Sequence, residues 1–268
     1  MLPKVFTVGD FFLPTYGLLV ALAFLAGLWV TTRLARQKGL NPDAITNLAV
    51  YCALAGILGA KLMMFVFDAG HYWRNPGDIF SLNTLQAGGV FHGGLVLALL
   101  TAVWYMRRAR LPGALTADVF APGIALGHGI GRLGCFAAGC CWGTECRLPW
   151  AVTFTNPDAY YLVGVPLHIP LHPTQLYEAG AEFLIFGVLL WRFYKPHRPG
   201  MLIGLYLVLY SIVRFLVEFV RAHEQVNPLG GPFSNTQWIA LGLLLTGLWL
   251  ILRRTSAAPV TEARTSQV

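Results

Sequence analysis

The sequence predicts an all-α integral membrane protein, a bundle of about seven transmembrane helices. Hydrophobic residues occupy 56% of the 268 positions and charged residues only 12%, whereas soluble domains contain about 25% charged residues. The apolar segments are continuous over helical lengths, while the strands of a membrane barrel would alternate apolar and polar residues over about 10 positions. These observations exclude a soluble globular protein and favour helices over barrel strands.

Seven segments meet or approach the length of about 20 apolar residues that a helix needs to cross the hydrocarbon core. The first follows a single cation, Lys4, and the acidic Asp10. We therefore expect it to remain as a membrane span and not to be cleaved as a signal peptide. The segments cover about 11–32, 45–67, 90–106, 114–131, 175–194, 201–220 and 236–252.

Lysine and arginine residues concentrate in alternate connections between these segments. Because cationic loops stay cytoplasmic, this distribution places the N-terminus outside and the C-terminus inside, as an odd number of spans requires. The formal net charge of +7 is therefore assigned to loop anchors, and no nucleic-acid partner is expected. The cytoplasmic cations are Arg33, Arg36, Lys38, Arg107, Arg108, Arg110, Arg192, Lys195, Arg198, Arg253, Arg254 and Arg264.

The chain is predicted to form one membrane domain, residues 1–254, followed by a short tail. The longest outward connection, within about 132–172, contains aromatic residues that favour the boundary between water and lipid, and it is expected to form a small external cap. The tail, residues 255–268, is small and polar and is predicted to be disordered on the cytoplasmic side. The aromatic residues are Trp142, Trp150, Tyr160 and Tyr161.

Tyr210, Arg214 and Glu218 recur every four residues in the sixth segment and therefore share one helix face. A charged side chain at membrane depth costs about 2.5–3.5 kcal/mol on insertion scales, so each charged residue there is expected to pair with another group or to serve a function. One interpretation is a structural Arg/Glu pair. The interpretation that we favour is that Glu218 holds Arg214 toward an anionic ligand and that Tyr210 supplies a hydroxyl.

Six glycines and a central arginine, Arg132, occupy residues 127–143. Glycines allow the backbone to leave the helix and expose N–H groups, which suits an oxyanion such as phosphate. The alternative is close helix packing at small residues, with Arg132 reaching outward to the interface. We favour anion binding by Arg132 in a cradle that four of the glycines shape: Gly131, Gly134, Gly139 and Gly143.

Other polar residues are weaker candidates. His92 lies among glycines at the start of the third segment, where it can act as a general base or satisfy a local hydrogen bond. Glu178 and Glu182, four apart, are suited to pair with a buried cation, although Glu182 fits a solvated acidic helix end equally well. The remaining candidates are Gln175 and two residues that also fit an ordinary interface role, Tyr16 and Lys61.

The five cysteines lie at positions 52, 135, 140, 141 and 146. An oxidising exterior would permit a disulfide, but spacing alone determines no pairing. The spacing is not a CxxC pattern, so no metal or redox site is predicted.

Together these motifs resemble the bacterial prolipoprotein diacylglyceryl transferases, in order and over most of the membrane portion. They are His92-Gly-Gly-Leu95, the Gly131–Gly139 stretch around Arg132, His172-Pro-x-Gln175-Leu-Tyr177-Glu178, and Tyr210-x3-Arg214-x3-Glu218. The resemblance implies an integral enzyme of the inner membrane, without a cofactor and with its active site toward the periplasmic leaflet. It also implies the reaction: the diacylglyceryl group of phosphatidylglycerol moves to the lipobox cysteine thiol of a prolipoprotein, a thioether forms and glycerol phosphate leaves, as the first step of lipoprotein maturation.

Three positions depart from the familiar family pattern. Cys135 stands where the family commonly has Asn, and Cys140 where it has Glu, so no role of that Asn or Glu can be transferred; another family form carries cysteines at these places. Lys61 stands where the family often has Arg, which keeps the charge and loses the bidentate fork.

The chemistry of this reaction suggests roles for the candidates. Arg132 binds the lipid phosphate, and Arg214 stabilises negative charge on the leaving oxygen. His92 takes or relays the thiol proton, because a free thiol with a pKa near 8.5 is mostly protonated at neutral pH. Glu218 orients Arg214, and Tyr210 donates a hydrogen bond to the headgroup or leaving phosphate. The other expected substrate-site residues are the four glycines, Tyr16, Lys61, Gln175 and Glu178.

Two other function classes use the same residues. A transporter or channel for an anionic solute would use the arginines for selectivity, but it predicts two halves of matching hydropathy, which the sequence lacks. A membrane thiol oxidoreductase would depend on Cys140 or Cys141 and would survive the loss of Arg132.

Overall fold

The computed structural model describes residues 2–8, 11–81, 84, 88–222 and 231–253. The tail predicted for residues 255–268 lies outside the described residues. The chain divides into two compact units, which are described separately. One comprises residues 1–27 and 120–268, and the other residues 28–119.

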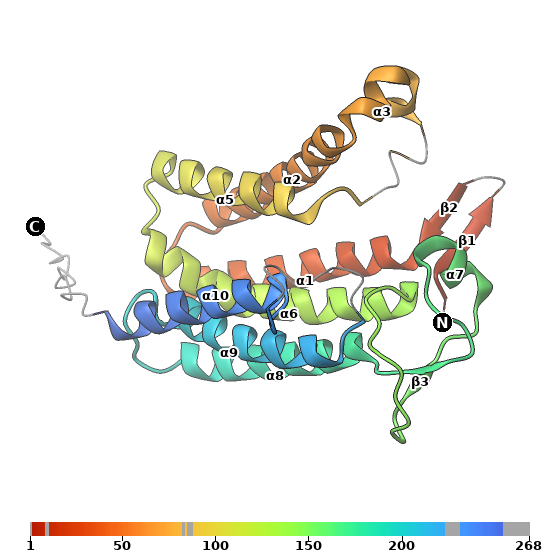
Figure 1. The fold of residues 1–268 in the computed structure, drawn as a ribbon. Coiled ribbons are helices and arrows are strands. Elements are labelled where there is room, and N and C mark those ends of the chain that lie inside the picture. The colour runs from red at the N-terminus through yellow and green to blue at the C-terminus, as the bar shows by residue number, and fades with distance from the viewer. Residues whose placement is uncertain (1, 9–10, 82–83, 85–87, 223–230, 254–268) are drawn as a thin grey trace, which may run out of the picture. The chain divides into compact units, whose positions relative to one another are not determined.

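Each of the seven predicted segments contains an α-helix (Figure 1). Within the described residues, four helical stretches are long and apolar enough to cross a membrane: Thr15–Gln37, Pro42–Phe67, Met201–Val220 and Asn235–Leu252. The chain is therefore a mostly helical membrane protein. The helices are α1 (Thr15–Gln37), α2 (Pro42–Phe67), α5 (Phe91–Arg108), α6 (Gly113–Ala138), α8 (Thr174–Phe193), α9 (Met201–Val217), which continues as η2 (Glu218–Val220), and α10 (Asn235–Leu252).

In the unit of residues 28–119, α2 and α5 form an antiparallel pair (Figure 1). Glycines bring the two backbones together: a Cβ added at Gly94 would lie 2.6 Å from the Gly56 carbonyl oxygen. Gly89 has a φ of +74°, and the next residue, Val90, donates its N–H to the Ala60 carbonyl at 3.0 Å. Two short helical pieces follow α2, namely α3 (Ala69–Arg74) and η1 (Pro76–Phe80).

In the other unit, α8, α9 and α10 pack in sequence order (Figure 1). Gly204 of α9 and Gly247 of α10 let these helices approach, because a Cβ at Gly247 would lie 2.7 Å from the Gly204 carbonyl oxygen. Gly27 of α1 faces Gly123 of α6 at the same hypothetical Cβ distance of 2.7 Å. Small residues at such crossings are typical of membrane helix packing.

A small cap follows α6 within the predicted range of about 132–172. Strand β3 (Val152–Thr153) pairs antiparallel with β4 (Pro170–Leu171), and α7 (Pro157–Val163) lies between them in sequence. The cap has its own hydrophobic core, which explains how so short a segment holds its shape. The buried residues of this core are Phe154, Ala159, Val165 and Leu171.

An N-terminal hairpin, β1 (Lys4–Val8) and β2 (Phe11–Pro14), joins the cap. The Lys4 Nζ atom lies 2.8 Å from Asp158 Oδ1 of α7. The prediction that residues 11–14 belong to the first span is wrong, because hydropathy alone does not separate a short apolar strand from the helix that follows it. The first helix begins instead at Thr15, directly after Pro14.

Candidate active site

A buried carboxylate, Glu178 of α8, contacts two guanidinium groups, Arg132 of α6 and Arg214 of α9. The Arg132 Nη2 atom lies 2.6 Å from Glu178 Oε2, and Arg214 Nη1 donates a hydrogen bond of 3.0 Å to Glu178 Oε1. The side chain of Glu178 is 3% exposed, and those of Arg132 and Arg214 are 14% and 10% exposed. Charges at this depth need partners, and these three partner one another.

The position of Glu178 follows from the amphipathic pattern of α8. The polar residues Thr174, Gln175, Glu178 and Glu182 share the buried face of this helix with the apolar residues of its second half. Recurrence at three- and four-residue spacing keeps them on one stripe. The first half of α8 therefore carries polar groups into the bundle.

Arg214 also contacts the carboxylate predicted to accompany it. Its Nη2 atom lies 2.6 Å from Oε2 of Glu218, four residues along the chain. Glu218 Oε1 accepts a hydrogen bond of 3.0 Å from the Ser234 hydroxyl, which also caps α10. The predicted pairing of Arg214 with Glu218 is confirmed, and this pair is tied to the start of the last helix.

His128 extends the network on the other side of Arg132. Its Nδ1 atom lies 2.9 Å from Glu182 Oε1, and its Nε2 atom accepts a hydrogen bond of 3.3 Å from Arg132 Nε. The ring of Tyr210 lies 5.6 Å from the His128 ring. Arg132 therefore uses Nε and Nη2, and within the described part of the chain no group accepts from its Nη1.

Two members of this network, His128 and Arg221, were not among the predicted site residues. Glu182, for which buried pairing and a solvated helix end were both left open, is buried and pairs with His128. The Arg221 Nη1 atom lies 3.9 Å from Glu178 Oε1. For His128 and Glu182 a signal existed, since each lies four residues from a candidate on the same helix, Arg132 and Glu178 respectively.

The glycine run does not open the helix as expected. Helix α6 continues to Ala138, so the N–H groups of Gly131 and Gly134 lie within a helix, and the backbone leaves it only at Gly139, with a φ of +85°. The run instead permits close packing: a Cβ at Gly134 would lie 3.3 Å from the Tyr16 ring. Close packing at Gly134 brings Tyr16 beside the predicted cradle, whereas Arg132 does not reach outward but pairs with the buried Glu178.

The loop after Gly139 is held by hydrogen bonds to the start of α8 and the strand before it. Gln175 Nε2 donates to the Cys140 carbonyl, and the Thr174 hydroxyl donates to the Cys141 carbonyl, each at 2.6 Å. The Gly143 N–H donates to the His172 carbonyl at 3.0 Å. The Gln175 amide N–H is thus used to position this loop.

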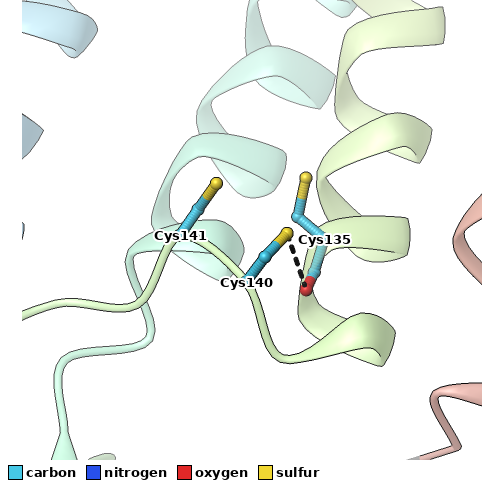
Figure 2. Close-up of side chains that lie close together, drawn as sticks. All are labelled: Cys135, Cys140 and Cys141. Atoms are coloured by element: carbon cyan, nitrogen blue, oxygen red, sulfur yellow. Dashed lines mark hydrogen bonds between the residues drawn. The ribbon is translucent and has the colours of Figure 1, made fainter. Parts of the chain in front are cut away.

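Three thiols gather at the junction of α6 and this loop. The sulfur atoms of Cys135, Cys140 and Cys141 all lie within 4.8 Å of one another (Figure 2). Hydrogen bonds with the Cys135 and Cys140 thiols lower the pKa of the Cys141 thiol. The positive charges of Arg221 and Arg132 act in the same direction, and burial opposes them.

Comparison with known proteins identifies the family to which this arrangement belongs. The family model of the prolipoprotein diacylglyceryl transferases matches residues 3–253. The chain belongs to the prolipoprotein diacylglyceryl transferase family. The four motifs of the sequence analysis lie within the matched residues.

Three relatives named phosphatidylglycerol–prolipoprotein diacylglyceryl transferase illustrate the similarity. The Nitratidesulfovibrio vulgaris (strain DSM 19637) protein is 37% identical over 269 residues, which cover 98% of this chain and 97% of the relative. The Bordetella avium protein is 35% identical over 266 residues, with coverage of 96% and 97%. The Clostridium tetani protein is 33% identical over 235 residues, with coverage of 88% and 90%. None of these three is named as a transporter, so they give no support to the transporter alternative.

Two of the predicted site residues, His92 and Lys61, belong to the unit of residues 28–119. His92 is exposed in the first turn of α5. The Lys61 Nζ atom donates a hydrogen bond of 2.5 Å to the Thr84 carbonyl, which ties α2 to the connection that precedes α5. Their roles in binding and proton transfer stay predictions.

Proposed function

We propose that this transferase moves the diacylglyceryl group of phosphatidylglycerol to the lipobox cysteine thiol of a prolipoprotein. Family membership supports the reaction class. The observation that carries the proposal is the pair of buried guanidinium groups, Arg132 and Arg214, that meet at Glu178. These cations match the demands of a reaction in which a phosphate leaves.

The bond changes define what the site must supply. The cysteine sulfur attacks the glyceryl carbon, the bond between that carbon and the phosphate oxygen breaks, and glycerol phosphate leaves with the bonding electrons. The thiol loses its proton, and the leaving phosphate gains one negative charge. Stabilisation of that charge by preorganised donors lowers the barrier, and guanidinium groups suit phosphate because of their planar fork of donors.

The guanidinium donors of the site support anion binding. Three guanidinium groups, those of Arg132, Arg214 and Arg221, lie around two carboxylates, Glu178 and Glu218. A third carboxylate, Glu182, pairs with His128 in the same network. The Nη1 atom of Arg132 is proposed to bind the lipid phosphate, because Nε and Nη2 are already engaged.

The other roles follow the same geometry. Arg214 stabilises the growing charge on the leaving oxygen while Glu218 fixes its guanidinium group. Tyr210 lies beside His128, which is hydrogen-bonded to Arg132, and its hydroxyl is proposed to bind the headgroup or leaving phosphate. Glu178 already contacts one Nη atom of each guanidinium group. The phosphate is therefore proposed to bind the remaining N–H donors of the two arginines without displacing the Glu178 carboxylate.

His92 is proposed as the base on the ground of its chemistry, since imidazole is the side chain that most often transfers protons in enzymes. The remaining predicted substrate-site residues are kept as proposals: Tyr16, Lys61, Gln175, Glu178, Gly131, Gly134, Gly139 and Gly143.

We further propose that residues 1–254 form one membrane domain with seven spans in the bacterial inner membrane. The distribution of lysine and arginine supports a periplasmic N-terminus and a cytoplasmic C-terminus. In this orientation the cap and the arginine network lie toward the periplasmic leaflet, where the lipobox cysteine of an exported prolipoprotein is presented.

The experiment that tests the function is incubation of the purified chain with labelled phosphatidylglycerol and a lipobox peptide. Mass analysis of the peptide cysteine is expected to show an intact diacylglyceryl group in thioether linkage, with glycerol phosphate released in equal amount. A peptide with serine in place of the cysteine is the matched control. Transfer of a single acyl chain, or no transfer, would contradict the proposal.

A further inference from the structure

The cluster of Cys135, Cys140 and Cys141 is not used by the proposed reaction. Cys135 lies in the last turn of α6, and the other two lie in the loop after it. The three side chains converge from these two segments (Figure 2), with all sulfur atoms within 4.8 Å of one another. All three cysteines are free thiols.

The backbone of the loop is fixed in the conformation that brings these thiols together. Cys141 has a φ of 63°, in the left-handed region, which residues with a Cβ rarely adopt and which marks functional sites when the surroundings enforce it. The Thr174 hydroxyl holds the Cys141 carbonyl at 2.6 Å. The N–H of Cys140 donates to the Cys135 carbonyl at 3.1 Å, and the Cys140 thiol donates to the same carbonyl at 3.7 Å.

The spacing of the sulfur atoms suits one small ion. For three atoms no more than 4.8 Å apart, the common centre lies at most about 2.8 Å from each, and a zinc–thiolate bond is about 2.3 Å long. A shift of about 0.5 Å per sulfur, well within a change of side-chain torsion, would therefore complete the coordination. The positive charges of Arg132 and Arg221 near Cys141 offset the negative charge of the thiolates.

We propose that Cys135, Cys140 and Cys141 form a thiolate site for a soft d¹⁰ cation, Cu⁺ in preference to Zn²⁺. Thiolates select soft cations. Within the described residues the group holds three ligands and no fourth histidine, cysteine or carboxylate, whereas structural zinc sites are closed by four. Binding releases the thiol protons to solvent, and the bound ion connects the end of α6 to the loop that α8 positions.

The test is a titration of the full-length chain, purified under reducing and anaerobic conditions, with Cu⁺ held by a coloured Cu⁺ chelator. We expect the protein to take one Cu⁺ per chain from the chelator, with a first shell of three sulfur atoms in X-ray absorption. Parallel titration with Zn²⁺ and its own chelator measures the preference. Absence of uptake, or tighter binding of Zn²⁺ than of Cu⁺, would overturn the proposal.

Cysteine-to-serine variants inside and outside the cluster test which thiols bind the ion. Cys140→Ser and Cys141→Ser are each expected to weaken Cu⁺ binding at least about tenfold. Cys146→Ser, which removes a buried thiol outside the cluster, and Cys52→Ser, which removes a half-buried thiol of α2, are expected to bind as the native chain does. Equal binding by all four variants would refute the assignment. Tryptophan fluorescence during heating confirms that each variant is folded, and the titration does not depend on transferase activity.

Discussion

Glu178 joins Arg132 and Arg214 through its two carboxylate oxygens: Arg132 Nη2 lies 2.6 Å from Oε2 in an ion pair, and Arg214 Nη1 donates a hydrogen bond of 3.0 Å to Oε1. The three residues come from α6, α8 and α9. Ion pairs with this one carboxylate therefore link the three helices. Removing it would leave two buried cations close together.

The first prediction concerns the stability of this arrangement. Glu178→Ala is expected to destabilise the protein by about 3–5 kcal/mol, because loss of one partner of a buried pair leaves uncompensated charge. Thermal unfolding of the purified protein in detergent measures the effect. Asp158→Asn, which breaks the partly exposed Lys4–Asp158 pair, is the control and is expected to cost no more than about 1 kcal/mol. Equal effects of the two substitutions would show that Glu178 does not hold the helices together.

The second prediction tests whether Arg214 acts through its positive charge alone or also needs the geometry of its guanidinium group. This guanidinium reaches Glu178 with Nη1 and Glu218 with Nη2, and a lysine ammonium cannot reproduce that fork. Arg214→Lys is expected to reduce diacylglyceryl transfer about 100-fold or more, as removal of a preorganised donor does, while the protein still folds and inserts. Arg132→Ala and Arg214→Ala are expected to abolish transfer.

Arg147→Lys in the exposed part of the cap is the control for this series and is expected to retain full activity. If Arg132→Ala or Arg214→Ala transferred the diacylglyceryl group at the native rate, the proposed role of that arginine would be wrong.

The third prediction tests His92 as the base. A general base accepts the thiol proton during the reaction, so the transfer rate is expected to rise with pH. His92→Gln is expected to remove that rise from the pH–rate profile. His71→Gln is the control in the same unit, since His71 pairs with Asp78 at 3.0 Å. An unchanged profile in His92→Gln would leave His92 a structural residue.

The fourth prediction concerns Gly143. A Cβ at this position would lie 2.6 Å from the Val220 carbonyl oxygen and 2.8 Å from that of His172. Gly143→Ala is therefore expected to destabilise the protein by about 1–3 kcal/mol through overpacking. Gly187→Ala in α8, where nothing lies within 4 Å, is expected to be neutral or to stabilise by up to about 1 kcal/mol through helix propensity. Thermal unfolding of both variants measures the difference, and a Gly143→Ala protein as stable as Gly187→Ala would contradict the close contact.

The residue pattern within single segments was sufficient to predict the helices and one contact of the site. Each helix of the seven segments was located by a run of apolar residues, because the cost of burying polar groups in lipid is set residue by residue along the chain. The Arg214–Glu218 pair was predicted because residues four apart on one helix face are neighbours whatever surrounds the helix. The paired strands of residues 4–8 and 11–14 were missed because a short apolar strand gives the same hydropathy as the start of a span.

The sequence by itself determined the membrane class, the helices and the residue types available for phosphate chemistry, since these depend on composition and on spacing within one helix. Only the tertiary structure decided that Arg132 and Arg214 share Glu178, that His128 and Arg221 join them, and that three cysteines meet at the end of α6. Such contacts depend on how helices distant in sequence are rotated and packed against one another. Helix packing fixes those rotations through contacts between side chains from different segments, which periodicity within one segment does not contain.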